Sequence, residues 1–168
     1  LFDLPAKDGP KNGIVTRAVD GLKKLKPAPL GIPEDAAKIQ PANYEEHLAL
    51  LGECDLVIEA IAERMDWKLD LYQRIATALA PHAIVASNTS GLSITKLSEA
   101  LPESIRPRFC GIHFFNPPRY MTLVELIATP ATSKWSRASP RATSSMACGR
   151  ARAPHCTTRA ARRLALHY

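Results

Sequence analysis

Short apolar runs of strand length alternate with amphipathic segments of helix length over the first 132 residues, and this alternation is the feature that most constrains the fold. The apolar runs predict the end of a strand at 1–2 and further strands at 55–61, 83–87 and 108–115. The helical spacing predicts helices at 12–25, 43–51, 66–79 and 93–101. Strands that alternate with helices of this length predict an α/β fold with a doubly wound, mostly parallel sheet.

The predicted helix boundaries rest on capping residues and prolines. Asn43 and Ser93 can cap the helices that follow them, because their side chains accept hydrogen bonds from free backbone N–H groups. Pro81 and Pro102 follow two of the helices. The Pro-rich stretch "KPAPLGIP" at 26–33 is typical of a connection.

The composition changes at about residue 132, which divides the chain into a body, 1–132, and a basic low-complexity tail, 133–168. The tail holds eight of the 22 Lys and Arg and none of the 16 Asp and Glu, so the body has 14 basic and 16 acidic residues and a net charge of −2. The net charge of +6 therefore reflects the tail alone.

Two interpretations of the tail remain open. Clustered arginines are typical of an arm that binds nucleic acid or another polyanion. Alternatively, GC-rich codons for the start of the tail, "SKWSRASP", spell Glu-Val-Val-Ala-Ser-Leu-Ala in a shifted frame, which resumes the style of the body. We favour a tail that is frameshifted or disordered over one that binds nucleic acid.

Membrane and disulfide-rich classes are not favoured. No stretch of 18 apolar residues occurs, and the start "LFDLPAK" has no signal-peptide pattern. The four cysteines are widely spaced and form no CxxC pair, so neither a metal site nor a disulfide framework is predicted. Free thiols in a reducing cytoplasm are the expected state.

Polar residues follow each predicted strand. In an open α/β sheet, ligands bind at the carboxyl ends of the strands, so these residues are candidates for one site. Each also has a structural explanation, as a turn former, a helix start or a local cap. Glu59, inside an apolar run, is either a functional group or an acid with an internal partner or an exposed edge. Lys68 lies at the start of the predicted helix that follows Glu63. The candidates at the strand ends are Asp3, Glu63, Ser87, Asn88, Thr89, Ser90, His113 and Asn116.

His113 and Glu125 are the most specific pair. Pro117 and Pro118 favour a turn that brings "TLVELI" back beside "GIHFF", so that the carboxylate of Glu125 lies near the imidazole of His113. A carboxylate that accepts from one ring nitrogen fixes the tautomer and leaves the other nitrogen free to take a proton. A structural histidine with an unrelated carboxylate is the alternative.

The segments "CDLVIEAIAERMDWK", "IVASNTSGLSI" and "CGIHFFNPPRYMTLVELI" together resemble the NAD-binding domain of 3-hydroxyacyl-CoA dehydrogenases of bacterial fatty-acid β-oxidation. The resemblance covers residues 1 to about 132 and implies a Rossmann-like fold, NAD as cofactor and an acyl-CoA substrate. It also implies a cytoplasmic enzyme that forms a homodimer through a further C-terminal domain.

The resemblance implies a role for each candidate residue. His113 is the expected general base, Glu125 orients it, and Ser90 and Asn116 contact the substrate and the nicotinamide region. Asp3 is expected to hold the adenosine ribose, which implies NAD rather than NADP. Glu63, Lys68 and Asn88 are expected to contact the cofactor.

One departure from the family pattern limits what we expect of this chain. The first strand and the GxGxxG loop of the family would precede Leu1, and no GxGxxG occurs in the 168 residues. Without that loop, the pyrophosphate loses its backbone donors, so we expect a partial, inactive NAD-binding domain with an exposed sheet edge. Non-catalytic structural use of the same fold and polyanion binding through the tail are the alternatives.

Overall fold

The computed structural model describes residues 1–118, 120–121, 123–132 and 164–166. In chain order the strands are β1 (Phe2–Asp3), β2 (Ala42–Asn43), β3 (Leu56–Glu59), β4 (Ile84–Ser87), β5 (Phe109–Phe114), β6 (Val124–Ala128) and β7 (Leu164–Leu166). The α-helices are α1 (Gly13–Leu22), α2 (Met65–Ile75) and α3 (Ile94–Glu99), and the 3-10 helices are η1 (Pro33–Lys38), η2 (Leu48–Glu53) and η3 (Arg106–Arg108).

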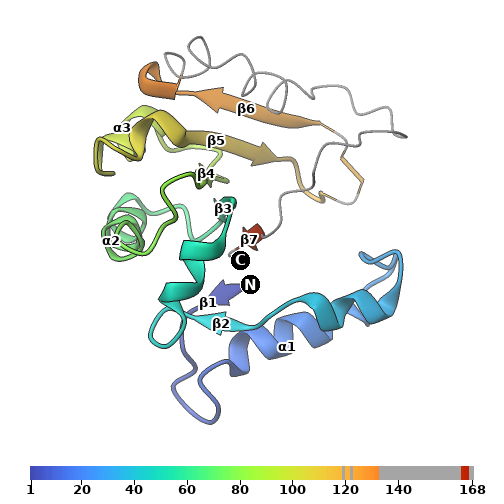
Figure 1. Cartoon of the computed structure of the whole chain (residues 1–168). Coiled ribbons are helices and arrows are strands. Elements are labelled where there is room, and N and C mark those ends of the chain that lie inside the picture. Colours follow the sequence, from blue (N-terminus) through green and yellow to red (C-terminus); the bar gives the residue numbers. More distant parts are fainter. Residues whose placement is uncertain (119, 122, 133–163, 167–168) are drawn as a thin grey trace.

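The main sheet has five strands in the order β6-β5-β4-β3-β7. All neighbouring pairs are parallel except β5 and β6, which are antiparallel. Strands β1 and β2 form a separate parallel pair next to this sheet (Figure 1). The crossovers that join parallel strands contain helices, so the predicted α/β fold with a mostly parallel sheet is confirmed.

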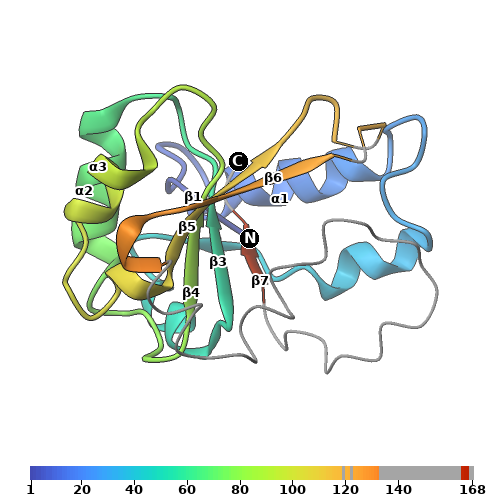
Figure 2. The ribbon, with the colours of Figure 1, turned by 90° about the horizontal axis from the view of Figure 1, so that it is seen from above.

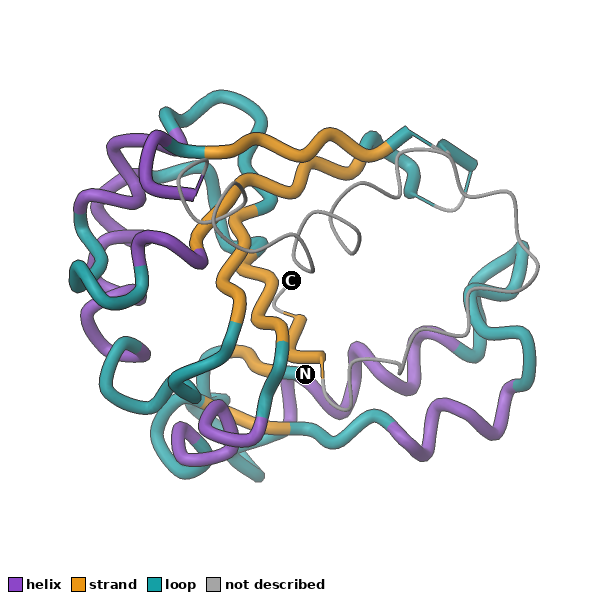
Figure 3. The backbone as a smooth tube through the Cα atoms, turned by 45° about the horizontal axis from the view of Figure 1, so that its top comes forward, coloured by secondary structure: helices purple, strands orange, loops and turns teal. Residues whose placement is uncertain are grey.

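Helices lie on both sides of the strands, as a doubly wound fold requires. Figure 2 shows α2 and α3 on one side and α1 on the other, and the tube view gives the same arrangement (Figure 3). The main core lies between α2, α3 and the sheet and includes Tyr72, Leu97 and Phe109. No helix in the described part of the chain is long and apolar enough to cross a membrane.

The predicted helix at 43–51 is wrong. Asn43 ends strand β2 beside Asp3, and a 3-10 helix, η2, begins only at Leu48. The side chain of Asn43 does accept from the backbone N–H groups of Glu45 and Glu46, at 3.0 and 2.9 Å. That contact closes a turn after a strand, so the local signal of a cap was present but the parallel pairing with β1 decided the structure. By contrast, Ser93 caps α3 as predicted, since its hydroxyl accepts from Lys96 N at 3.3 Å.

The free edge of β3 is covered by the chain's own tail. Residues Leu164–Leu166 pair in parallel with Leu56–Ile58, where we expected an exposed edge. The rest of the tail, 133–163 and 167–168, lies outside the described residues. Its disorder therefore stays a prediction.

Candidate active site

The carboxyl ends of β3, β4 and β5 meet at one edge of the sheet because these strands are parallel and in register. Glu59 at the end of β3 lies opposite Ser87 at the end of β4, and Ser87 lies opposite Gly111 in β5. The loops that leave these strands carry most of the predicted site residues. The convergence expected from the sequence is therefore present for the residues that follow β3, β4 and β5, but not for Asp3, because β1 belongs to the separate pair with β2.

His113 and Glu125 form a hydrogen-bonded pair across the antiparallel strands β5 and β6. They are direct register partners, and His113 Nδ1 lies 2.9 Å from Glu125 Oε2. The His113 side chain is 21% exposed and that of Glu125 51%, so the imidazole is partly shielded but reachable. The ring of Phe115 lies 4.6 Å from the imidazole, centroid to centroid. With Nδ1–H donating to Glu125, Nε2 is the nitrogen that can accept a proton.

Asn88 joins the loop after β4 to the end of β5. Its side-chain oxygen accepts from the backbone N–H of Phe114 at 3.1 Å, and its own N–H donates to the carbonyl of Glu59 at 2.7 Å. The loop is thereby held next to His113. Asn88 was predicted as a cofactor contact, and that role stays a prediction.

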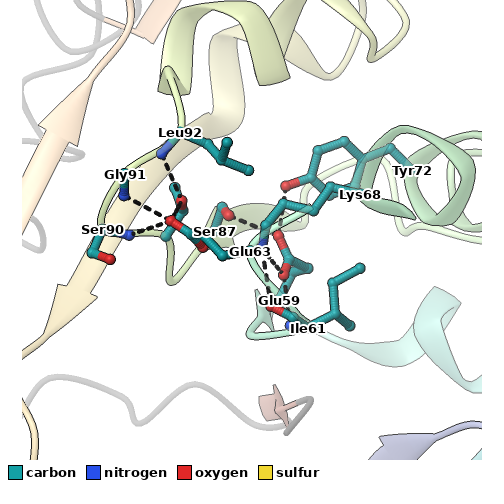
Figure 4. A network of polar contacts seen from close by, with 10 residues as sticks. Glu59, Ile61, Glu63, Lys68, Tyr72, Ser87, Ser90, Gly91 and Leu92 are labelled. Carbon is teal, nitrogen blue, oxygen red and sulfur yellow. Dashed lines mark hydrogen bonds and ion pairs between the residues drawn. The ribbon is translucent and has the colours of Figure 1, made fainter. Parts of the chain in front are cut away.

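Glu63 fixes the backbone around Ser90. One carboxylate oxygen, Oε1, accepts from Thr89 Oγ1 at 2.5 Å, from Ser90 N at 3.0 Å and from Gly91 N at 2.7 Å (Figure 4). Burial raises the pKa of Glu63, but the hydrogen bonds from Thr89, Gly91 and Ser90, with the charge of Lys68, outweigh it and leave that pKa below its ordinary value. The Ser90 hydroxyl has no hydrogen-bond partner among the described residues, so it can contact a ligand.

Stability should therefore depend on Glu63 at acid pH. Since the folded-state pKa is lowered, the stabilisation is fully present above the ordinary value of 4.5 and is lost as the pH falls through the folded-state pKa. Below pH 4.5, we expect the unfolding free energy of Glu63→Gln to change less with pH than that of the unaltered chain. The two should differ by less than about 1 kcal/mol, because the group is exposed. Urea unfolding at several pH values measures this. Glu103→Gln, an exposed acid outside these contacts, is the control, and identical profiles for both variants would contradict the assignment.

Lys68 is completely buried on α2, and its ammonium group pairs with Glu59 at 2.5 Å. An internal partner was one of the explanations given for an acid at position 59 inside an apolar run. Lys68 is such a partner. The predicted cofactor contact of Lys68 stays a prediction. The sequence did not identify Tyr72 and Ser87 as partners of Glu59; the only signal was an acid inside an apolar strand.

Two predicted residues lie apart from these contacts. Asp3 ends β1, and its Oδ1 accepts from the N–H of Leu4 at 2.6 Å. Asn116, the second residue after the end of β5, is exposed. Among the described residues no group of three or more potential metal ligands occurs.

The chain that carries this sheet edge is similar to known proteins. The family model described as 3-hydroxyacyl-CoA dehydrogenase, NAD binding domain, matches residues 15–145. The chain belongs to the 3-hydroxyacyl-CoA dehydrogenase family. The match continues beyond residue 132, where the composition changes, and the division into body and tail stays a prediction.

Relatives in this family are considerably longer than this chain. Human mitochondrial hydroxyacyl-coenzyme A dehydrogenase is 49% identical, over 80% of this chain and 48% of the human protein. A Rickettsia felis protein assigned as a fatty acid oxidation complex trifunctional enzyme is 48% identical, over 76% of this chain and 18% of that protein. This chain thus spans less than half of either relative.

Solved structures of the family share this fold. The (S)-3-hydroxybutyryl-CoA dehydrogenase of Ralstonia eutropha is 31% identical with a TM-score of 0.53, over 76% of this chain and 46% of that one. The 3-hydroxybutyryl-CoA dehydrogenase of Escherichia coli K12 is 29% identical with a TM-score of 0.59, over 82% of this chain and 30% of that one.

NAD is the cofactor that defines the matched domain, and the residues present fit part of it. Asp3 Oδ2 has no hydrogen-bond partner among the described residues and suits the hydroxyls of a ribose. Ser90 and the His113 pair lie at the carboxyl edge of the sheet, where open α/β sheets bind their ligands. No GxGxxG sequence is present for the pyrophosphate. The chain therefore offers polar groups that suit the two ends of NAD, whereas the pyrophosphate lacks the GxGxxG pattern.

Proposed function

We propose that this chain is part of an oxidoreductase that oxidises (S)-3-hydroxyacyl-CoA to 3-oxoacyl-CoA with NAD in fatty-acid β-oxidation. The observation that carries the proposal is the hydrogen-bonded pair of His113 and Glu125 at the carboxyl edge of the sheet, at 2.9 Å. A histidine with one nitrogen held by a carboxylate and the other free suits a reaction that removes a proton near neutral pH.

The reaction removes a hydride from C3 of the substrate and a proton from its 3-hydroxyl group. NAD, when bound, supplies the hydride acceptor. Nε2 of His113 takes the hydroxyl proton, while Nδ1–H keeps its hydrogen bond to Glu125, whose negative charge stabilises the imidazolium that forms. Ser90 and Asn116 contact the substrate oxygen from the loops after β4 and β5. Proton and hydride leave together, so the hydroxyl becomes a ketone.

Cofactor choice and location belong to the same proposal. A carboxylate at Asp3 accepts hydrogen bonds from a free ribose 2′-hydroxyl and repels a 2′-phosphate, which favours NAD over NADP. Glu63, Lys68 and Asn88 serve the cofactor from the loops and helix beside it. We place the protein in the cytoplasm, a proposal that the buried free thiols of Cys54 and Cys110 support. Assembly as a homodimer would need a domain beyond this one.

We predict that the purified 168-residue chain forms no measurable NADH from (S)-3-hydroxybutyryl-CoA, because it lacks a glycine-rich loop for the pyrophosphate. The test has two arms. The first assays the chain itself by NADH absorbance, and turnover there would contradict this prediction.

The second arm assays a chimera in which residues 1–132 replace the matching segment of the Ralstonia eutropha enzyme, which supplies the remaining parts of the fold. We expect the chimera to oxidise (S)-3-hydroxybutyryl-CoA. A folded chimera that binds NADH but does not oxidise the substrate would argue against the proposed function.

A further inference from the structure

A buried polar cluster lies under the loops of the candidate active site. It consists of Glu59, Lys68, Tyr72 and Ser87, each at most 1% exposed (Figure 4). The four side chains come from three elements, namely β3, α2 and β4. Only Lys68 among them has a proposed role, as a cofactor contact, and its ammonium group is buried against Glu59. The pairing of a buried acid with a buried amine therefore needs a further explanation.

Both carboxylate oxygens of Glu59 are fully used. Oε1 accepts from Lys68 Nζ at 2.5 Å and from Ile61 N at 2.7 Å. Oε2 accepts from Tyr72 OH at 2.8 Å and from Ser87 Oγ at 2.7 Å. Burial, together with the charge of Glu59, raises the pKa of Tyr72 far above its ordinary value, so the phenol remains a donor. Glu59 is therefore the single acceptor that joins the other three side chains.

The cluster is continuous with the loops above it. Glu59 and Ser87 are the last residues of their strands, and the carbonyl of Glu59 accepts from Asn88 N at 2.7 Å. The charge of Lys68 contributes to the lowered pKa of Glu63, the residue that holds the backbone at Ser90. A change at Glu59 can thus alter both loops. One loop follows Glu59 directly in the chain, and the other is joined to it by a hydrogen bond from Asn88 N.

A buried ion pair of this kind does little for net stability, because desolvation offsets most of the attraction and an apolar group of similar volume often serves as well. What an apolar group cannot do is hold a strand end, a neighbouring strand end and a helix at fixed hydrogen-bond distances. The geometry therefore favours a positioning role.

We propose that Glu59 is a positioning residue of the dehydrogenase site. Through Lys68 on α2 and Ser87 on β4, it fixes the loop that carries Glu63 relative to the loop that carries Asn88 and Ser90. That the site belongs to a dehydrogenase rests on the proposed function, whereas the positioning of the two loops does not.

The test compares Glu59→Gln with the double variant Glu59→Gln/Lys68→Met in the full 168-residue chain. Two quantities are measured: the urea midpoint of unfolding, and the amide ¹⁵N–¹H spectrum with hydrogen-exchange rates at Asn88, Ser90 and Gly91. The single variant leaves the charge of Lys68 uncompensated, so we expect a lower midpoint and at least about tenfold faster exchange at these three amides.

The double variant separates positioning from stability. It removes the unpaired charge, so the midpoint should recover in large part, while the exchange at the three amides should stay fast. Recovery of both together, or unchanged loop amides in the single variant, would overturn the proposal. Asp70→Asn, an exposed acid on the same helix, is the matched control and should change neither quantity.

A milder variant keeps the proposal testable if Glu59→Gln does not fold. Tyr72→Phe removes one of the four hydrogen bonds and keeps the ring in the core. We expect the same three amides to shift and exchange faster, by a smaller factor, and unchanged loop amides would count against Glu59. None of these readouts needs NAD or substrate, so a chimera without activity would refute the proposed function and leave this result standing.

Discussion

Glutamine in place of His113 should lower the turnover number of the chimeric dehydrogenase by about 10²–10⁴-fold, the range that a general base contributes. The amide of glutamine can still form hydrogen bonds but cannot take the proton of the substrate hydroxyl. The Michaelis constants for NAD and for (S)-3-hydroxybutyryl-CoA should change far less, because the loss concerns the transition state. Steady-state NADH formation measures both quantities.

His82 offers a matched control, since it is also a histidine paired with a carboxylate. Its Nε2 lies 3.0 Å from Asp55 Oδ1, before the amino ends of β3 and β4 and away from the loops of the site. His82→Gln should leave turnover within about twofold. If His113→Gln behaves like His82→Gln, the general-base assignment is wrong.

The pairing with Glu125 can be checked without any activity. Because Glu125 accepts from Nδ1, the neutral imidazole of His113 should carry its proton on Nδ1, which ¹⁵N spectra of the ring distinguish from the other tautomer. Glu125→Ala should abolish that preference. An Nε2–H tautomer in the unaltered chain would remove the structural basis of the mechanism.

Valine in place of Gly111 should destabilise the fold by about 1–3 kcal/mol, the usual effect of overpacking a core. A Cβ at Gly111 would lie 2.9 Å from both Cγ1 and Cδ1 of Ile94 and 3.0 Å from Cβ of Ile127. The side chain would thus force α3 and β6 away from β5. For a chain of this size, each kcal/mol corresponds to roughly 2–4 °C in melting temperature.

Thermal and urea unfolding check this expectation, and the chain contains a suitable control. Gly21, in α1, has nothing within 4 Å of an added Cβ, so Gly21→Ala should be neutral or stabilising by up to about 1 kcal/mol. Shortening Ile94 to alanine should recover part of the loss in Gly111→Val. A melting temperature unchanged by Gly111→Val would show that α3 and β6 do not pack as closely as described.

The sequence alone was sufficient where the signal is local. The apolar runs and helical periods gave the positions of β3, β4, β5, α1, α2 and α3, because burial of one face imposes those periods on nearby residues. The cap of α3 followed from Ser93, whose hydroxyl needs only the next turn of the helix. His113 and Glu125 were also predicted as a pair, because only a short turn separates their strands.

Only the tertiary structure decided what depends on residues far apart in the chain. Asn43 has the local properties of a helix cap. It nevertheless lies in a strand, because it pairs in parallel with β1, about 40 residues earlier in the chain. From the sequence, Lys68 is expected to be a solvated residue near a helix start. In the structure its Nζ lies in the core, 2.5 Å from Glu59 Oε1. Such contacts form between elements brought together by the whole fold, and no local period in the sequence records them.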